Sequence, residues 1–559
     1  MKSSLSLALV VLLYGLFSWL TNLPQDVGSD VPQGKLNSMS FAPYREGQGP
    51  MEKRFPSPEQ IDEDLKLMGE TTHTIRTYAS SEGNMPVIPG LAGKYGLKMI
   101  QGAWLNAIPE DNKREINELI RSANANPDVV KRVMVGNEVL LRGDLKPEQI
   151  IEYIREVKRS VKQPVSYADV WSEYMKHPQL IKEVDFITIH ILPYWEDKPI
   201  TVDQAPEHIE RIYKQVQKEA ESIAPGKPIL IGESGWPGEG KQRGGAIPGV
   251  VNEAKFIREL IKVANKNGFD YNIVEAFNQP WKSAFEGVVG ANWGLYDVDR
   301  EEVFPLTGSV HENPEWLKST AIAVFILLVV VLFSRNQLNG LSTLKTFGYL
   351  LFIQTLAALL VDQAHILWYT SYSDWQRLQS VLLIGLNVLI GGLVTQRILA
   401  LLSHASINPK LSQWLYASYI VFAGYAVYKT FGLAYQGRYL SFPIQTAAVP
   451  VVSILGLIAT FLVNQDKHIG IDHLLGHQSP KRVQNTQLGI LLLVMGGALI
   501  IGETSAFFIS RDFIAEHPAT TDRLSLSLLY TLGNAQLVQW LFSLLILALP
   551  LLSCKKTSA

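Results

Sequence analysis

The feature that most constrains the fold is a change in composition near Pro314, after which the sequence consists of apolar runs separated by short polar segments. Each run is about 20 residues long, the length that an α-helix needs to cross the hydrocarbon core of a bilayer. A helix satisfies its own backbone hydrogen bonds, so lipid-exposed runs of this kind are helical. We predict an all-α, polytopic transmembrane domain over residues 318–556 with about seven helices, at residues 318–334, 345–362, 380–402, 413–435, 441–464, 487–509 and 526–553.

The N-terminus carries a further apolar run, LSLALVVLLYGLFSWL, directly after Lys2 and two serines. This pattern is typical of a signal anchor or a signal peptide, which we place at residues 1–24. No small-x-small cleavage motif follows clearly, which favours an uncleaved anchor, with a cleaved signal as the alternative. In either case the polar segment that follows is expected to cross the membrane. With Lys2 in the cytoplasm, alternating spans place Lys345, Lys410, Lys481 and Lys555 there as well, in agreement with the positive-inside rule.

Charge and cysteine content exclude several classes of protein. The 50 Lys and Arg residues balance 52 Asp and Glu residues, so there is no overall positive field to hold nucleic acid. The single cysteine, Cys554, excludes a disulfide framework, a cysteine zinc site and an iron-sulfur cluster. Together with the predicted topology, the missing disulfides indicate a multi-pass protein of a cell membrane, of the bacterial inner-membrane type, with its polar domain on the outer, periplasmic side.

The polar segment contains eight short β-rich runs that alternate with amphipathic helical stretches such as residues 147–161 and 207–223. This alternation predicts an α/β domain, a (β/α)8 TIM barrel over residues 30–312. A doubly wound open sheet is the alternative, but no G-x-G-x-x-G follows any of the runs. The runs begin at Ser38, His73, Leu97, Val130, Pro164, Val184, Pro228 and Tyr271.

Two carboxylates stand where strands of such a barrel end. The fourth run ends in Gly136-Asn137-Glu138, and the seventh continues through Glu233 into S-G-W-P. The loops after the strands build the active site of a TIM barrel, so Glu138 and Glu233 are expected to face each other across its mouth. A pair of carboxyl groups in this position suits glycoside hydrolysis, in which one protonates the leaving oxygen and the other acts at the anomeric carbon.

These motifs resemble glycoside hydrolase family 17, the β-1,3-glucanase and β-1,3-glucanosyltransferase family, and the overall architecture resembles its membrane-bound bacterial-type members. The resemblance covers roughly residues 36–305 and implies a retaining enzyme in which Glu138 is the acid/base, Glu233 is the nucleophile and Asn137 binds the sugar 2-hydroxyl. Further matches are Ile75-Arg76-Thr77-Tyr78, Asp185-Phe186, Pro193-Tyr194 and Asn292-Trp293-Gly294-Leu295-Tyr296.

Other side chains near the strand ends are candidates for substrate binding. Arg76 and Tyr194 are expected to donate hydrogen bonds to Glu233 or to orient it. Aromatic rings stack on the apolar faces of glucose, and Glu286 is expected to bind sugar hydroxyls, with Glu275 as a rival carboxylate. The predicted substrate-binding set is Asn137, Arg76, Tyr78, His190, Tyr194, Trp195, Trp281 and Glu286.

We expect neither a cofactor nor a metal. His190 replaces the Asn of many plant members of the family, but no second histidine stands at metal-ligand spacing in the polar domain. His468, His473 and His477 fall in one predicted cytoplasmic loop and match no known ligand motif.

The expected function is therefore retaining hydrolysis of β-1,3-glucan, of the endo-1,3-β-glucosidase type, through a covalent glucosyl-enzyme. One alternative is a glucanosyltransferase that elongates, branches or cyclises periplasmic glucan. The other is a non-catalytic glucan receptor or export component, which the presence of both glutamates disfavours. The expected partners are β-glucan and the lipid bilayer, with a glucan synthase or export protein as a further candidate.

Overall fold

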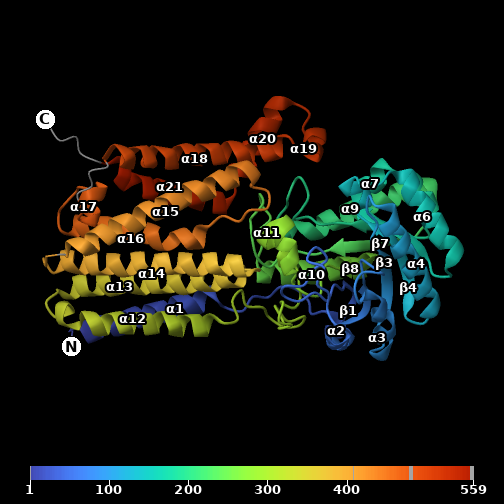
Figure 1. The fold of residues 1–559 in the computed structure, drawn as a ribbon, viewed down its shortest axis with the longest axis horizontal. Helices are drawn as coiled ribbons and strands as arrows, with labels where there is room; N and C mark the ends of the chain where they lie inside the picture. Colours follow the sequence, from blue (N-terminus) through green and yellow to red (C-terminus); the bar gives the residue numbers. More distant parts are fainter. Residues whose placement is uncertain (1, 407, 478–481, 554–559) are drawn as a thin grey trace. The chain divides into compact units, whose positions relative to one another are not determined.

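The computed structural model describes residues 2–406, 408–477 and 482–553, and the chain forms two compact units (Figure 1). One unit spans Pro24–Glu312, and the other combines Met1–Leu23 with Asn313–Ala559. Lys481, Cys554, Lys555 and the predicted domain end at residue 556 lie outside the described residues.

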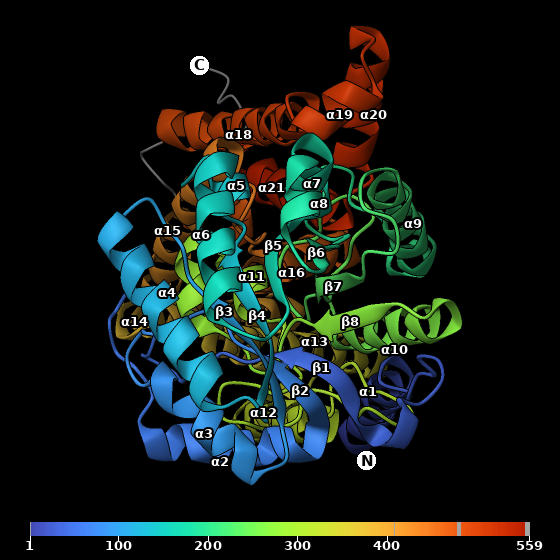
Figure 2. The same cartoon turned by 90° about the vertical axis from the view of Figure 1, so that its right-hand side faces the viewer.

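The unit Pro24–Glu312 is a closed barrel of eight parallel strands in chain order, surrounded by helices (Figure 2). Strand β1 pairs with β2 on one side and closes on β8 through the pairing of Met39 with Ile273. Every strand overlaps one of the eight predicted runs, and the predicted TIM barrel is confirmed. The strands are β1 (Leu36–Ser40), β2 (Thr72–Arg76), β3 (Lys98–Ala103), β4 (Val130–Asn137), β5 (Val165–Val170), β6 (Ile187–His190), β7 (Ile229–Ser234) and β8 (Asp270–Ile273).

Amphipathic helices cover the outside of the barrel. In α6, Ile150, Ile154 and Val157 are buried, and their spacing of four and three residues places them on one helix face. The long covering helices are α2 (Pro58–Thr71), α4 (Pro109–Ala125), α6 (Pro147–Ser160), α9 (Ala205–Ile223) and α10 (Val250–Asn267). Shorter helices follow several strands: α3 (Ile88–Lys94), α5 (Val139–Arg142), α7 (Trp171–Lys176), α8 (Gln179–Glu183) and α11 (Ser283–Ala291).

The ladder is irregular near the carboxyl ends of the strands. The register shifts between Met134 and Asn137 where β4 meets β5, and between Ile231 and Ser234 where β7 meets β8. Such bulges bend a strand and re-aim its side chains, and they are common next to active sites. Here they lie directly at the strand ends that carry the two predicted catalytic glutamates.

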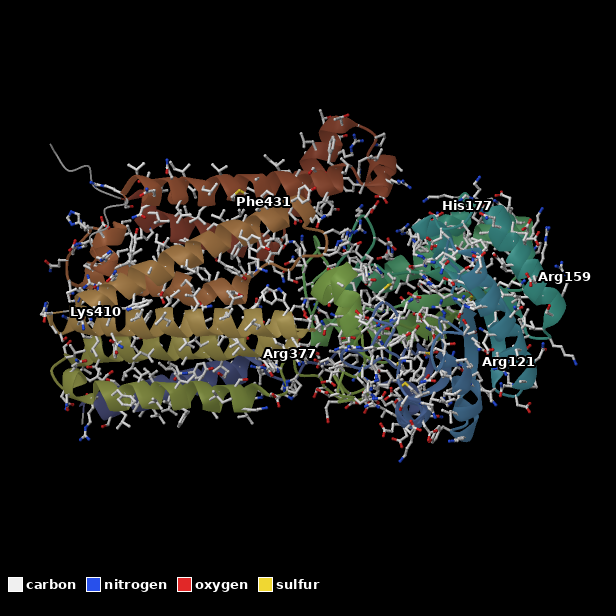
Figure 3. All side chains as sticks on the ribbon, in the orientation of Figure 1. Arg121, Arg159, His177, Arg377, Lys410 and Phe431 are labelled. Atoms are coloured by element: carbon white, nitrogen blue, oxygen red, sulfur yellow. The ribbon has the colours of Figure 1, made fainter. Side chains whose placement is uncertain are left out.

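The second unit consists of helices. Seven helices are, by length and composition, apolar enough to cross a membrane among the described residues. In Figure 3 the side chains of α12 and the helices after it are mostly carbon, whereas nitrogen and oxygen atoms crowd the barrel helices that carry Arg121 and Arg159. The seven are α1 (Lys2–Thr21), α12 (Trp316–Leu338), α13 (Thr343–Tyr369), α14 (Asp374–Leu402), α16 (Ile444–Val463), α18 (Arg482–Phe508) and α21 (Ala535–Leu552).

One of the predicted spans differs from the structure, and another forms a helix of lower hydropathy than the rest. The run at residues 526–553 is not one helix, because α20 (Thr520–Leu532) ends at Gly533 and α21 begins after Asn534, whose side chain caps it by accepting from the Leu537 backbone amide. The run at residues 413–435 does form a helix, α15 (Pro409–Gln436). However, α15 contains Lys410, Lys429 and several tyrosines, and it is not among the seven helices that are apolar enough to cross a membrane.

A buried amide compensates for a proline inside α16. Pro450 has no amide hydrogen, so the carbonyl of Thr446, four residues earlier, loses its helical partner. The fully buried side chain of Asn387, from α14, donates to this carbonyl at 3.0 Å. The contact ties α14 to α16 where Pro450 removes a helical hydrogen bond.

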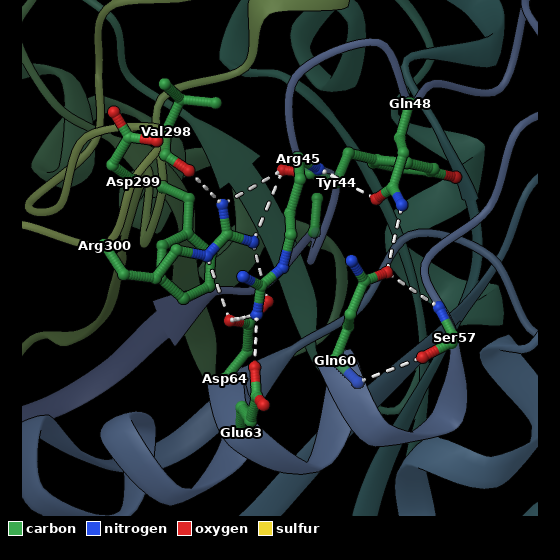
Figure 4. A network of polar contacts seen from close by, with 12 residues as sticks. Tyr44, Arg45, Gln48, Ser57, Gln60, Glu63, Asp64, Val298, Asp299 and Arg300 are labelled. Carbon is green, nitrogen blue, oxygen red and sulfur yellow. Dashed lines mark hydrogen bonds and ion pairs between the residues drawn. The ribbon is translucent and has the colours of Figure 1, made fainter.

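A buried carboxylate, Asp64, ties the loop after β1 to the end of the barrel domain (Figure 4). Arg300 donates to both oxygens of Asp64, at 2.9 and 2.6 Å, and Arg45 adds a third contact at 3.1 Å. Asp64 is 1% exposed, so its charge depends on these two guanidinium groups. Arg300 also donates to the backbone carbonyl of Tyr44, whose ring packs edge-on against Trp281 with the centroids 6.1 Å apart.

We predict that Asp64→Asn destabilises the barrel by about 3–5 kcal/mol, because it leaves the charge of Arg300 buried without its partner. The matched control is Asp62→Asn on the same helix, where Asp62 pairs with the exposed Lys94 at 3.1 Å. Its loss is expected to stay within about 1 kcal/mol. The stability of both variants is measured by urea unfolding of the full chain in detergent, with proteolysis of the unfolded barrel as the readout. Equal losses of stability in Asp64→Asn and Asp62→Asn would contradict the role of Asp64.

Candidate active site

Glu138 is held by an unusual backbone conformation at the end of β4. Its φ of 52° lies in the left-handed region, and Gly136, two residues earlier, has a φ of 91°. A residue other than glycine adopts such a φ only when its surroundings impose it. The amide of Glu138 donates to the carbonyl of Ala168 on β5 at 2.8 Å, which anchors the turn.

Glu233 lies on β7 and is nearly buried, with 8% of its surface exposed. The guanidinium of Arg76, at the end of β2, donates to its Oε1 at 2.9 Å. Arg76 also donates to the carbonyl of Gly232 at 2.8 Å and to Oδ1 of Asn137 at 2.6 Å. A single buried cation therefore joins the ends of β2, β4 and β7, and it makes the contact to Glu233 that the sequence predicted.

His190 lies between the two glutamates. Its Nδ1 is 2.8 Å from Oε1 of Glu138 and its Nε2 is 3.5 Å from Oε1 of Glu233. The imidazole ring is fully buried at the end of β6. One oxygen of Glu138 and one of Glu233 lie within 4.8 Å of each other. This spacing is close to the roughly 5–5.5 Å between the carboxyl groups of retaining glycosidases and shorter than the roughly 6.5–9.5 Å of inverting ones.

The surroundings of Glu233 keep it ionised. Burial raises its pKa, but the charges of His190 and Arg76 and the hydroxyl of Tyr78 act in the opposite direction, and the net result is a pKa below the usual value. The pKa of Tyr78 is raised by burial and by the Glu233 charge, so its hydroxyl remains protonated. That hydroxyl also lies 2.9 Å from the hydroxyl of Ser40, and Arg76 lies over the ring at 4.9 Å.

Tyr194 contacts the loop after β7. Its hydroxyl donates to the carbonyl of Lys241 at 2.5 Å, and its ring is fully buried among Trp195, Trp236 and Trp293. The hydroxyl of Tyr78, two residues after the end of β2, lowers the pKa of Glu233. Tyr194 supports the aromatic wall of the site through packing.

The two predicted tryptophans are half-buried. Trp195 stacks on Trp293 with the ring centroids 6.4 Å apart and an interplanar angle of 17°. The indole of Trp281 donates to Gln279 at 2.8 Å, which fixes the ring against Tyr44. Both residues are therefore held in place by neighbours and stay partly exposed to solvent, as a stacking surface for sugar requires.

A second group of charged side chains surrounds Lys282, a residue that is not among the predicted site residues. Lys282 pairs with the buried Glu275 at 2.6 Å, and burial raises the pKa of Glu275 to about 7. The pKa of Glu286 is raised as well, mainly by burial. The charge of Lys282 acts to lower it, and the charges of Glu138 and Glu233 act to raise it. Glu286, on α11, therefore lies within the electrostatic reach of both central glutamates.

Asp169, at the end of β5, was also missed. Burial raises its pKa to about 6. Its carboxylate accepts from the amide of Leu140 at 3.2 Å and from the hydroxyl of Tyr167, and so holds the backbone just after Glu138. The rule that selected Glu138 and Glu233, a polar residue at a strand end, also applies to Asp169 and would have identified it.

Glu138, His190 and Glu233 also have the atom types of a metal site. The guanidinium of Arg76, 2.9 Å from Glu233, would however repel a second cation at this place. The arrangement suits a pair of carboxyl groups that handle protons and a carbon centre better than one that holds an ion.

The known proteins that this chain resembles are glycoside hydrolases and glucosidases that agree with one another in type. Residues 38–294 match the BtgE/BtgC glycoside hydrolase domain. A glucan 1,3-β-glucosidase of Arthroderma benhamiae is 30% identical over 331 residues, which cover 56% of this chain and 99% of that protein. A glucan 1,3-β-glucosidase of Schizosaccharomyces pombe is 28% identical, with 41% of this chain and 75% of that protein covered.

Among solved structures, a glycoside hydrolase family 17 β-1,3-glucanosyltransferase of Rhizomucor miehei is 27% identical, with 48% of this chain and 96% of that chain covered and a TM-score of 0.42. The match to the Arthroderma protein extends over nearly the whole of that relative. This chain belongs to the glycoside hydrolase family 17 type of β-1,3-glucanases and glucanosyltransferases.

Proposed function

We propose that the barrel cleaves β-1,3-glucosidic bonds with retention of configuration, with Glu138 as the acid/base and Glu233 as the nucleophile. The observation that carries this proposal is the separation of at most 4.8 Å between oxygens of the two carboxyl groups. Inversion requires a water molecule between carboxylate and sugar, and this spacing leaves too little room for it. The family to which the chain belongs supports the choice of β-1,3-glucan as substrate.

The first half of the reaction forms a glucosyl-enzyme. Glu138 gives its proton to the glycosidic oxygen as the bond to the anomeric carbon breaks, and Oε2 or Oε1 of Glu233 bonds to that carbon. The shorter glucan leaves with the proton. Glu233 must be ionised for this step, and the positive charge of Arg76 favours that state.

The second half decides between hydrolysis and transfer. The ionised Glu138 removes a proton from the acceptor, whose oxygen replaces Glu233 at the anomeric carbon. If the acceptor is water, the product is a shorter glucan, and if it is a sugar hydroxyl, the product is a longer or branched glucan. Asn137, held by Arg76, is placed to bind the 2-hydroxyl of the reacting sugar in both halves.

The remaining predicted residues form the glucan-binding surface in this proposal. Trp195 and Trp281 offer partly exposed rings for stacking, and Glu286 offers a carboxyl group to sugar hydroxyls. His190 orients Glu138 through its 2.8 Å contact, and Tyr194 braces Trp195 from behind.

We further propose that the helical unit spans a cell membrane of the bacterial inner-membrane type and that the barrel works on its outer side. Seven apolar helices and large exposed side chains such as Phe333, 85% exposed, support insertion in lipid. Membrane attachment suits modification of a glucan that is being made or exported, so a glucan synthase or exporter is a suitable partner.

The roles of the two glutamates can be separated with substrates of different leaving groups. Glu138→Gln is expected to reduce turnover of β-1,3-gluco-oligosaccharides by roughly 10²–10⁴-fold, because the leaving oxygen is no longer protonated. The first release of dinitrophenol from an aryl glucoside needs little protonation and is expected to persist as a burst, followed by slow turnover because Glu138 is also the base that activates the acceptor. Glu233→Gln is expected to lose both activities, and the exposed Glu148→Gln is the control. Identical profiles for the two variants would contradict the assigned roles.

Product analysis by mass spectrometry distinguishes hydrolysis from transfer. The full chain in detergent is incubated with β-1,3-gluco-oligosaccharides labelled at the reducing end. Shorter products alone indicate a hydrolase, and products longer than the substrate indicate a glucanosyltransferase. NMR identifies the anomer of the new reducing end when it first forms. We expect the β anomer, and an α anomer would contradict retention. If the folded wild-type chain shows no turnover, the result would favour the alternative of a non-catalytic glucan receptor or export component.

Removing the cation below Glu233 should change the pH dependence. Arg76→Met is expected to move the acidic limb of the kcat/KM profile to higher pH by about 1 unit or more, because the pKa of Glu233 rises when the positive charge is lost. Arg76→Lys retains the charge and should move the limb less, and Arg121→Met on the barrel surface should not move it. An unchanged limb in Arg76→Met would show that Arg76 does not set the ionisation of Glu233.

The topology is tested by labelling single cysteines in a Cys554→Ser background. Arg121→Cys, exposed on the barrel, is expected to react in intact cells with a maleimide that cannot cross the membrane. Lys410→Cys, exposed at the start of α15, should react only after the cells are opened. The reverse pattern would place the barrel in the cytoplasm.

A further inference from the structure

The turn after α16 brings together three side chains of types that bind metals, all from an eight-residue segment. Asp466 precedes His468 by two residues, and His473 lies in the short helix α17 (Ile471–Leu475). Oδ1 of Asp466 is 2.9 Å from Nδ1 of His468, and its Oδ2 is 2.6 Å from Nε2 of His473. One ligand atom from each residue lies within 4.8 Å of the other two.

This arrangement is close to the geometry of a metal centre. Zn²⁺ binds imidazole nitrogen and carboxylate oxygen at about 2.0–2.2 Å, so three ligands of a tetrahedral site are roughly 3.4 Å apart. The two imidazole–carboxylate distances, 2.9 and 2.6 Å, are shorter than this, so the ligand atoms must separate by less than about 1 Å to surround an ion. The side chains of His468 and His473 are 53% and 45% exposed, which leaves access for the ion and room for water at a fourth position.

The turn that carries Asp466 is preformed. Gln465 adopts a left-handed φ of 63°, and the amide of Asp466 donates to the carbonyl of Phe461 at 2.9 Å. The amide of His468 in turn donates to Oδ1 of Asp466 at 2.9 Å. These contacts orient the carboxylate toward both imidazoles without any ion.

His473 is held from two sides. Its ring packs on Phe461, with the centroids 4.7 Å apart, and its backbone carbonyl accepts from Arg397 of α14 at 3.0 Å. Arg397 also donates to the carbonyl of Leu474 at 3.0 Å. The second histidine is thus fixed to both α14 and α16, so little ordering remains for ligand binding to impose.

We propose that Asp466, His468 and His473 form a binding site for a divalent transition-metal ion of the zinc type. Two imidazoles and one carboxylate favour such ions over Mg²⁺ and Ca²⁺, which prefer oxygen ligands. A bound ion would fasten the end of α16 to α17.

The proposal is tested by zinc titration of the full chain in detergent after EDTA treatment and dialysis. The wild-type chain is expected to bind Zn²⁺ at a site that Ca²⁺ does not occupy. Asp466→Asn and His468→Ala should each weaken binding at that site by at least about 10-fold, as expected for lost metal contacts. His468 is the preferred position because its ring is the more exposed of the two.

The matched control is His477→Ala, which removes a histidine close in sequence whose ring lies 5.1 Å from that of Tyr416 and outside the three-residue cluster. It should bind Zn²⁺ like the wild type. Co²⁺ gives a second readout, since binding by the cluster should produce a visible absorption band that His468→Ala loses. The proposal would be overturned if the wild-type chain took up no Zn²⁺. It would also be overturned if the wild type, Asp466→Asn and His468→Ala bound Zn²⁺ with equal affinity.

Discussion

The active site depends on the burial of one positive charge, that of Arg76. Its side chain is 1% exposed, and an unpaired guanidinium at such a position would be strongly destabilising. The charge is compensated by Glu233, by the amide oxygen of Asn137 and by the carbonyl of Gly232, which come from two other strands. The same contacts that make burial of Arg76 tolerable set the distance between β4 and β7, and with it the distance between the two glutamates.

Both units use buried amides to satisfy backbone carbonyls at irregular points. In the barrel, Asn272 of β8 donates to the carbonyl of Gly232 at 3.0 Å and to Ser40 at 2.8 Å, just below the site. In the helical unit, Asn387 serves the carbonyl of Thr446 that Pro450 leaves free. A buried carbonyl without a donor costs about 1–3 kcal/mol, so Asn387 offsets the cost of Pro450, whereas Asn272 adds a second donor to the Gly232 carbonyl that Arg76 already contacts.

The sequence predicted the barrel because its strands are short β-rich runs between amphipathic helices, and it predicted the position of Glu138 and Glu233 because both follow such runs. It did not predict that Tyr78 acts on Glu233, since Tyr78 and Tyr194 both follow strands and only the bulges and packing decide where each hydroxyl points. The break at Gly533 was missed because one Asn cap, Asn534, interrupts an otherwise apolar run. The Asp466 cluster has no linear motif and exists only through the turn after α16.

The backbone of Glu138 restricts how the leaving group can be reached. Its left-handed turn is fixed by Ala168 on one side and, through Leu140, by Asp169 on the other, while His190 holds the carboxyl group itself. An acid anchored at three points has little freedom to follow a poorly placed glycosidic oxygen. Selectivity for the linkage would then arise from the sugar beyond the cleavage point, since only a chain whose bend presents that oxygen to a stationary proton donor can react.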